Sequence, residues 1–264
     1  MNILCIGDIF GKPGRRAIAA LLPRIIAEEK IDLVVVNGEN AAGGKGISDK
    51  VCEELFKGPI DVITAGNHIW EHASLRPYFD THPIVRPLNV ADVQPGKGSL
   101  VVKARNNASV AVVCVQGQIF MEDKGAKVVS PFKSIKEEIA RLKELTNIIV
   151  MDMHAETTSE KRAMAWYLDG HITALVGTHT HVQTADEEVM PNGTAYISDL
   201  GMTGPHASVI GLDKDVALHR FLTGDKRKYE VARGGVRMEG VVIRTDETTG
   251  KALSIKRIKV PLEV

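Results

Sequence analysis

The chain has 264 residues, of which 44% are hydrophobic and 25% are charged, so its composition is that of a folded globular protein and not of a disordered or fibrous one. Lys and Arg together number 33, as do Asp and Glu, so the formal net charge is zero. The chain therefore has no overall positive charge that would attract it to nucleic acid or to an acidic membrane. No apolar run has the length of a membrane span, and three scattered cysteines without a CxxC pair exclude a disulfide framework or a thiolate zinc site. We therefore expect a cytoplasmic protein.

The first third of the chain alternates between strand and helix patterns. Residues 2–7 form an apolar run, and residues 13–30 carry apolar side chains at helical spacing. A strand over 31–40, a helix over 48–56 with Ser48 as its N-cap, and a strand over 60–68 follow. This alternation predicts a parallel sheet with right-handed crossover helices.

The rest of the chain predicts a second sheet. Residues 99–104 and 108–117 form two adjacent strands with a turn at 105–107. Helices are expected at 130–144 and 159–170, strands at 147–154 and 172–179, and further strands near 194–201, 236–246 and 251–260. We expect an α/β fold, with two sheets face to face and helices outside them, in a single domain over residues 1–264.

Most of the predicted strands end in side chains that bind metals. These residues are Asp8, Glu39 with Asn40, Asn67 with His68, Asp152 with His154, and His179 with His181. In α/β sheets, sites form outside the carboxyl ends of the strands. Taken singly, each residue has an ordinary explanation: Asp8 could cap a helix, Asn67 could occupy a turn, and paired histidines arise by chance. Their recurrence at five strand ends predicts a metal site.

The donor set contains carboxylates, carboxamides and imidazoles but no thiolate. Such donors suit manganese, iron or zinc, and the sequence does not choose among them. The donors are too many for one ion. A carboxylate such as Glu39 could bridge two ions about 3.5–4 Å apart, the arrangement used to cleave phosphoesters.

Two further stretches have open interpretations. Residues 41–47, AAGGKGI, fit neither nucleotide-binding glycine pattern and form either a flexible loop or a phosphate cradle beside Glu39 and Asn40. Residues 225–237, DKRKYEVARGGVR, form either a solvated hairpin or a contact to a phosphate. The remaining histidines that we considered, His72, His82, His171 and His206, are expected at the surface or in packing roles.

The series GD, NGEN, GNH, a later His and GTHTH resembles the calcineurin-like metallophosphoesterase superfamily. The longer stretches GDIFGKPGR, NGENAAGGKGI, TAGNHIWE, MDMHAE, VGTHTHVQTAD and SDLGMTGP are similar to its YmdB-type branch. That branch is associated with cleavage of 2′,3′-cyclic nucleotides and other phosphodiesters. The resemblance implies a four-layer αββα sandwich, homo-oligomers (a dimer or a tetramer), and two metal ions per chain, iron first and manganese next, with zinc or magnesium as alternatives.

The resemblance also implies a role for each matching residue. One metal would be held by Asp8, Glu39, Asn40 and His181, and the second by Glu39, Asn67, His154 and His179, with Glu39 bridging. His68 matches the position of the proton donor. Phe10 and Glu39 stand where most of the superfamily has His and Asp, and both departures occur together in the YmdB-type branch. We interpret Asn40 as the replacement for the imidazole that Phe10 lacks.

The expected activity is hydrolysis of 2′,3′-cyclic nucleotides, and of other phosphodiesters such as RNA ends, by a metal-bound hydroxide with His68 as general acid. No membrane partner is expected. Two alternatives stay open at this point. One is a phosphomonoesterase or nucleotidase that uses the same ligand set. The other is a regulatory protein that binds metal or nucleotide.

Overall fold

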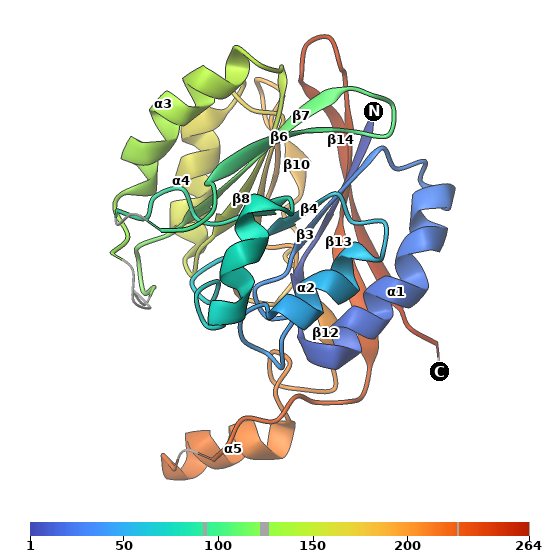
Figure 1. The fold of residues 1–264 in the computed structure, drawn as a ribbon, viewed down its shortest axis with the longest axis vertical. Coiled ribbons are helices and arrows are strands. Elements are labelled where there is room, and N and C mark those ends of the chain that lie inside the picture. Colours follow the sequence, from blue (N-terminus) through green and yellow to red (C-terminus); the bar gives the residue numbers. More distant parts are fainter. Residues whose placement is uncertain (92–93, 122–126, 226, 264) are drawn as a thin grey trace.

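Two β-sheets pack face to face in the computed structural model, which describes residues 1–91, 94–121, 127–225 and 227–263 (Figure 1). The first sheet has the strand order β2-β12-β13-β1-β3-β4-β5, and β14 also pairs with β13. Its strands are β1 (Asn2–Ile6), β2 (Asp8–Ile9), β3 (Leu33–Asn37), β4 (Val62–Thr64), β5 (Ile84–Val85), β12 (Met202–Pro205), β13 (Val236–Thr245) and β14 (Ala252–Pro261). The strands from β1 to the β5 edge pair in parallel, as the alternation predicted for the first strands of the chain.

The second sheet has the order β10-β11-β9-β8-β7-β6. Its strands are β6 (Ser99–Lys103), β7 (Ser109–Gln116), β8 (Ile148–His154), β9 (Ala174–Thr178), β10 (Glu188–Val189) and β11 (Ala195–Ile197). The antiparallel pairing of β6 with β7 confirms the turn expected at 105–107. Strands β7, β8 and β9 are parallel, so their carboxyl ends lie at one edge.

Alternating side chains of the central strands divide the core into layers. In β1, Ile3 and Cys5 belong to the cluster between the sheets, whereas Leu4 and Ile6 belong to the cluster on the helix-covered face. Both faces are therefore buried, which explains why the strand reads as one continuous apolar run.

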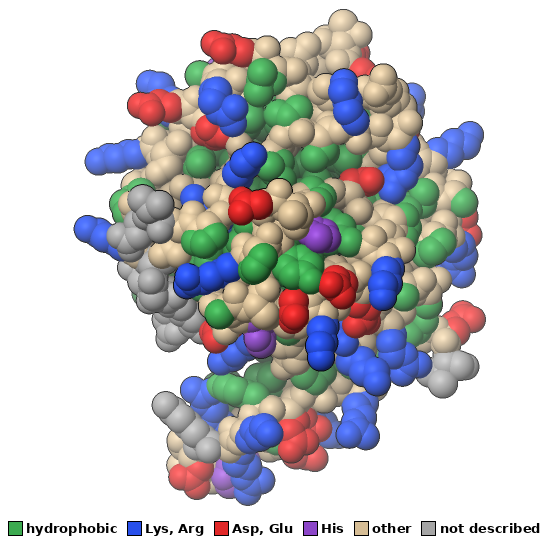
Figure 2. All heavy atoms as spheres, viewed as in Figure 1, with side chains coloured by type: hydrophobic (Ala, Val, Ile, Leu, Met, Phe, Trp, Pro, Cys, Tyr) green, Lys and Arg blue, Asp and Glu red, His purple; other side chains and the backbone are tan. Residues whose placement is uncertain are grey.

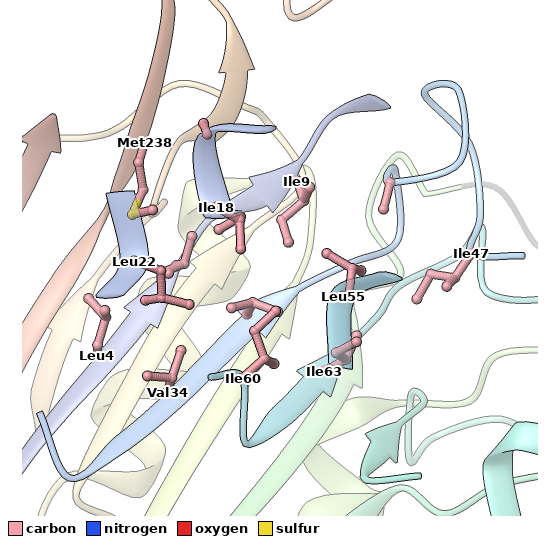
Figure 3. Close-up of a cluster of buried hydrophobic side chains, with 14 of the residues drawn as sticks. Leu4, Ile9, Ile18, Leu22, Val34, Ile47, Leu55, Ile60, Ile63 and Met238 are labelled. Carbon is pink, nitrogen blue, oxygen red and sulfur yellow. The ribbon is translucent and has the colours of Figure 1, made fainter. Parts of the chain in front are cut away.

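Helices cover the outer faces of both sheets. The helices are α1 (Gly11–Glu28), α2 (Asp49–Phe56), α3 (Pro131–Lys143), α4 (Thr158–Leu168) and α5 (Lys214–Thr223), with a 3₁₀ helix η1 (Ala73–Asp80). Figure 3 shows Ile18 and Leu22 of α1 and Leu55 of α2 meeting Leu4 and Ile63 of the first sheet. Helices α3 and α4 pack in the same way on the second sheet, which confirms the four-layer arrangement.

Capping residues in the sequence marked the start of one helix correctly, but another helix was missed. Ser48 caps α2 as predicted, because its Oγ accepts from the backbone N–H of Val51 at 3.3 Å. Helix α5 was not predicted, although Asp213 caps its start and Gly224, with φ of 77°, ends it. This helix projects from the body (Figure 1). No helix in the described part of the chain is long and apolar enough to cross a membrane.

The stretch 225–237, which the sequence left open between a solvated hairpin and a phosphate contact, is described except for one residue. The described residues of this stretch run back from α5 toward β13 and pair with the segment before α5. The Asp213 backbone N–H donates to the Glu230 carbonyl at 2.8 Å, and the Ala232 N–H donates to the Gly211 carbonyl at 3.0 Å. The stretch is therefore the return limb of a projecting arm.

Candidate metal centre

The carboxyl ends of strands from both sheets bring the predicted ligands together. Asp8 lies in β2, and His154 is the last residue of β8. The other predicted ligands lie within three residues after a strand: Glu39 and Asn40 after β3, Asn67 after β4, and His179 and His181 after β9. Residues far apart in the sequence meet here because parallel strands end at the same edge of a sheet.

One group of donors surrounds the Nε2 atom of His154. This atom lies 3.1 Å from Glu39 Oε1, 3.2 Å from Asn67 Oδ1 and 3.0 Å from His179 Nδ1. Ligand atoms of Glu39, His154 and His179 all fall within 4.8 Å of one another. Gly66 is required beside them, since a Cβ there would lie 2.0 Å from the His154 ring. The four residues assigned to one ion therefore lie together.

A second group surrounds the Asn40 carboxamide. Its Nδ2 atom lies 3.1 Å from His181 Nε2, 3.2 Å from Glu39 Oε1 and 3.4 Å from Asp8 Oδ1. His181 Nε2 is 3.7 Å from Asp8 Oδ1. These are the four residues assigned to the other ion, and Glu39 contacts both groups. A half-turn of the Asn40 amide would exchange its nitrogen for the oxygen that a metal requires.

The three imidazoles are oriented as metal ligands. His154 Nδ1 faces Thr178 Oγ1 at 2.9 Å, and His181 Nδ1 faces the Ile210 carbonyl at 2.8 Å. In each ring this contact holds a proton on Nδ1 and leaves the Nε2 lone pair toward the donors. His179 is turned the other way, with Nδ1 toward His154. The donor chemistry, the orientation of the rings and the sharing of Glu39 fit two divalent ions.

Burial and mutual contact change the acidity of these groups. Burial raises the pKa of Asp8 to about 6. Burial also opposes ionisation of Glu39, but the charge and hydrogen bond of His154 outweigh it and lower the pKa of Glu39 to about 2. Burial opposes protonation of His154, but Glu39 outweighs it and raises the pKa of His154 to about 9. Burial and the neighbouring His154 lower the pKa of His179 to about 3. Without metal, the proton on His154 therefore neutralises Glu39.

Asp152 was grouped with the strand-end donors but does not join them. Its carboxylate is buried between the sheets, where it accepts hydrogen bonds from Asn37 Nδ2 at 3.0 Å, Thr178 Oγ1 at 2.7 Å and the hydroxyl of Thr64. Burial raises the pKa of Asp152. Because Thr178 also accepts from His154, Asp152 orients the metal-facing imidazole through one hydroxyl group.

The loop with His179 and His181 has an unusual backbone. Both histidines have positive φ, 99° and 65°, a region that residues other than glycine seldom occupy. A buried ion pair supports the loop: Lys161 Nζ donates to Asp199 Oδ2 at 2.9 Å and to the Thr178 carbonyl at 2.8 Å. The same Asp199 oxygen accepts the backbone N–H of the residue between the histidines at 3.1 Å.

Phe10 packs beneath the second donor group instead of contributing to it. Its ring is buried and meets the His181 ring edge-on, with centroids 5.4 Å apart. Gly44 and Gly211 lie against the other sides of the ring, where an added Cβ would come within 2.9 Å and 2.6 Å. Phe10 therefore fixes the plane of His181, and the two glycines leave room for it.

His68 stands at the rim of the centre. Its backbone N–H donates to Glu39 Oε2 at 3.4 Å, and its side chain is 13% exposed. The Nδ1 atom faces Glu71 Oε1 at 3.1 Å. A carboxylate at this distance orients the ring.

Sequence reasoning did not find Lys161, Asp199 or Thr178. Lys161 carried a signal, because it shares one face of α4 with Met164 and Leu168 at spacings of three and seven residues. A lysine on the buried face of a helix predicts a buried partner. Nothing in the sequence identified Asp199 as that partner.

Comparisons with known proteins agree with this geometry. Residues 4–258 match the model of a family described as YmdB-like protein. A Bacillus subtilis protein named 2′,3′-cyclic-nucleotide 2′-phosphodiesterase is 43% identical over 98% of this chain and 96% of its own. A Mycoplasma pneumoniae crystal structure described as a novel phosphatase has a TM-score of 0.92 and 36% identity over 99% of this chain and 93% of that one. A hypothetical protein from Thermus thermophilus has a TM-score of 0.91 and 37% identity over 99% of both chains. This chain belongs to the YmdB-like family.

Proposed function

We propose that the protein is a dinuclear-metal phosphodiesterase that hydrolyses 2′,3′-cyclic nucleotides. The observation that carries this proposal is the contact of Glu39 with both donor groups, since a shared carboxylate is what a pair of catalytic ions requires. The similarity to the Bacillus subtilis phosphodiesterase supports the choice of substrate, and the name of that relative favours cleavage of the 2′ ester bond.

Seven residues would hold the ions: Asp8, Glu39, Asn40, Asn67, His154, His179 and His181. When bound, two such ions supply Lewis-acid activation of a water molecule and neutralise the phosphate oxygens. Mixed imidazole and oxygen donors suit iron, manganese and zinc, and the resemblance to the YmdB-type branch makes iron the first choice and manganese the next. Zinc and magnesium remain alternatives.

His68 supplies the proton that the leaving sugar oxygen needs. Glu71 holds Nδ1, so the transferable proton is on Nε2, and the backbone contact to Glu39 keeps the ring beside the donor groups. The Lys161–Asp199 pair keeps His179 and His181 in their positive-φ positions. This rigidity keeps the donor atoms in place before substrate arrives.

We also propose a homo-oligomer, a dimer or a tetramer, that acts in the cytoplasm on small nucleotides and on RNA ends. The absence of overall charge fits small substrates as well as a local contact to RNA.

A substrate panel on one metal-analysed preparation tests the function. We expect about two ions per chain and turnover of a 2′,3′-cyclic nucleotide to the 3′-monophosphate, faster than that of a linear diester or a monoester. Glu39→Gln should lose metal and activity together. Preferred turnover of the monoester would indicate a nucleotidase, and a fully loaded protein that turns over none of the three would be a binding protein.

A further inference from the structure

A large cavity in the described part of the chain lies apart from the donor groups. It is a cleft of about 1090 Å³ between the start of α1, the segment 231–237 and the last residues of β14. None of the seven predicted metal ligands lines it. Figure 1 shows the start of α1 close to the lower part of β13, and Figure 2 shows Lys and Arg side chains gathered on this lower side of the molecule. We call this cavity the basic cleft.

Cationic side chains line the cleft, and three of them have no carboxylate partner among the described residues. The lining includes five cationic residues and no Asp or Glu; the five are Lys12, Arg15, Arg16, Arg233 and Arg237. Arg15 pairs with Glu54, and Arg237 pairs with Glu239. Within the described residues, no carboxylate lies at ion-pair distance from Lys12, Arg16 or Arg233, and all three are exposed. The cleft therefore has a local positive charge, although the protein as a whole has none.

Short contacts connect the cleft to the metal centre. The backbone N–H of Gly11, next to Lys12, donates to the Asn40 carbonyl at 3.0 Å. Arg15 Nη1 donates to the Ala41 carbonyl at 2.7 Å. Gly43, four residues after Glu39, lines the cleft itself. The loop 41–47 therefore follows two predicted metal ligands, Glu39 and Asn40, and lines the cleft at Gly43.

The lining is suited to phosphates and not to bases. Apart from the cations it consists of glycine, alanine and aliphatic side chains, with no aromatic ring on which a base could stack. Cations on two facing walls, α1 and the 231–237 segment, match a chain of phosphates that runs between them. The volume is slightly above the range for small-molecule pockets, which ends at about 1,000 Å³.

We propose that the basic cleft binds backbone phosphates of a single-stranded oligonucleotide whose end lies at the metal centre. This inference rests on the proposed function, and it gives a role to part of each stretch that the sequence left open, namely Gly43 and residues 231–237. Small cyclic nucleotides would use the metal centre alone. An oligonucleotide that ends in a cyclic phosphate would use both.

Charge reversal at two exposed residues tests the proposal. Metal-loaded wild type and the double variant Arg16→Glu/Arg233→Glu are titrated into a labelled single-stranded RNA of about 12 nucleotides, and binding is followed by fluorescence anisotropy over a range of salt. We expect the variant to bind at least about tenfold more weakly and the slope of log K against log salt to fall by roughly 1.4, that is about 0.7 for each lost phosphate contact. The matched control Arg24→Glu/Lys136→Glu makes the same change of charge at exposed positions outside the cleft and should bind as wild type.

Three results would overturn the proposal. Unchanged RNA binding by Arg16→Glu/Arg233→Glu is the first. In the second, a free mononucleotide displaces the labelled RNA as well, per phosphate, as unlabelled RNA does. This would mean that the cleft binds a small phosphorylated ligand. An altered sedimentation coefficient with unaltered RNA binding would mean a subunit interface. Hydrolysis of a cyclic mononucleotide by wild type is measured separately, so a failure of the proposed function is recognised independently of the RNA result.

Discussion

Lys161 and Asp199 form a buried ion pair, with 2.9 Å between Nζ and Oδ2, directly beneath the loop that carries two of the predicted metal ligands. Both side chains are almost fully excluded from solvent. The pair does not touch a donor atom of the centre. Two of its hydrogen bonds go to the backbone on both sides of His179, at Thr178 and Thr180. The pair thereby stabilises a conformation that the histidines would not adopt by themselves.

Removing one partner of the Lys161–Asp199 ion pair should destabilise the folded protein. Lys161→Met leaves the Asp199 charge buried without its partner, and we expect the free energy of unfolding to fall by about 3–5 kcal/mol in chemical denaturation. Lys161→Met/Asp199→Asn should recover part of this loss, because the amide oxygen still accepts the loop N–H without a charge. Lys143→Met at the end of α3 is the surface control. If the double variant is no more stable than Lys161→Met, the buried charge is not the cause.

His68 should affect rate and not metal content. His68→Ala is expected to lower kcat for a cyclic nucleotide by about 10²–10⁴-fold with unchanged metal stoichiometry, because the leaving oxygen loses its proton source. An aryl phosphodiester, whose leaving group needs no proton, should be affected much less. His171→Ala is the control. An equal loss on both substrates would assign His68 a structural role.

Asn40 should matter for one ion only. Asn40→Ala removes a donor from the group of Asp8 and His181, and we expect at least about a tenfold loss of affinity in one of two binding steps in a calorimetric metal titration. Asn67→Ala, which removes the corresponding amide from the His154 group, should weaken the other step. Equal weakening of both steps by Asn40→Ala would contradict the idea that Asn40 replaces an imidazole beside Phe10.

The metal-free protein should lose stability as the pH rises above neutrality. Burial disfavours the charged His154 ring, but Glu39 outweighs it and raises the pKa of His154 from 6.5 to about 9. The folded state thus holds this proton more tightly than the unfolded chain. The resulting stability is complete below pH 6.5 and is lost as the pH rises to about 9.

The size of this loss follows from the pKa difference and amounts to roughly 3 kcal/mol at most. It is measured by urea denaturation of chelator-treated protein at several pH values. Glu39→Gln removes the carboxylate that raises the pKa, so its stability should vary much less between pH 6.5 and 9. An equal fall in wild type and Glu39→Gln would show that another group titrates.

Much of this molecule could be predicted from local patterns. Continuous apolar runs located the central strands, because both faces of the sheets are covered. Helical spacing of apolar residues located helices α1 to α4. The arm with α5 was missed. Its Leu218, Phe221 and Leu222 are exposed, and a helix without a buried face gives no amphipathic pattern to recognise.

For the site, the sequence alone determined which residue types end which strands, because those residues follow apolar runs and carry metal-binding atoms. Only the tertiary structure decided which of them meet: Asp152 turns into the space between the sheets, whereas His154, two residues later on the same strand, reaches Glu39. The same holds for Lys161 and Asp199, and for the five cations of the basic cleft. These are contacts between separate elements, and their geometry depends on how sheets and helices pack and not on any local pattern.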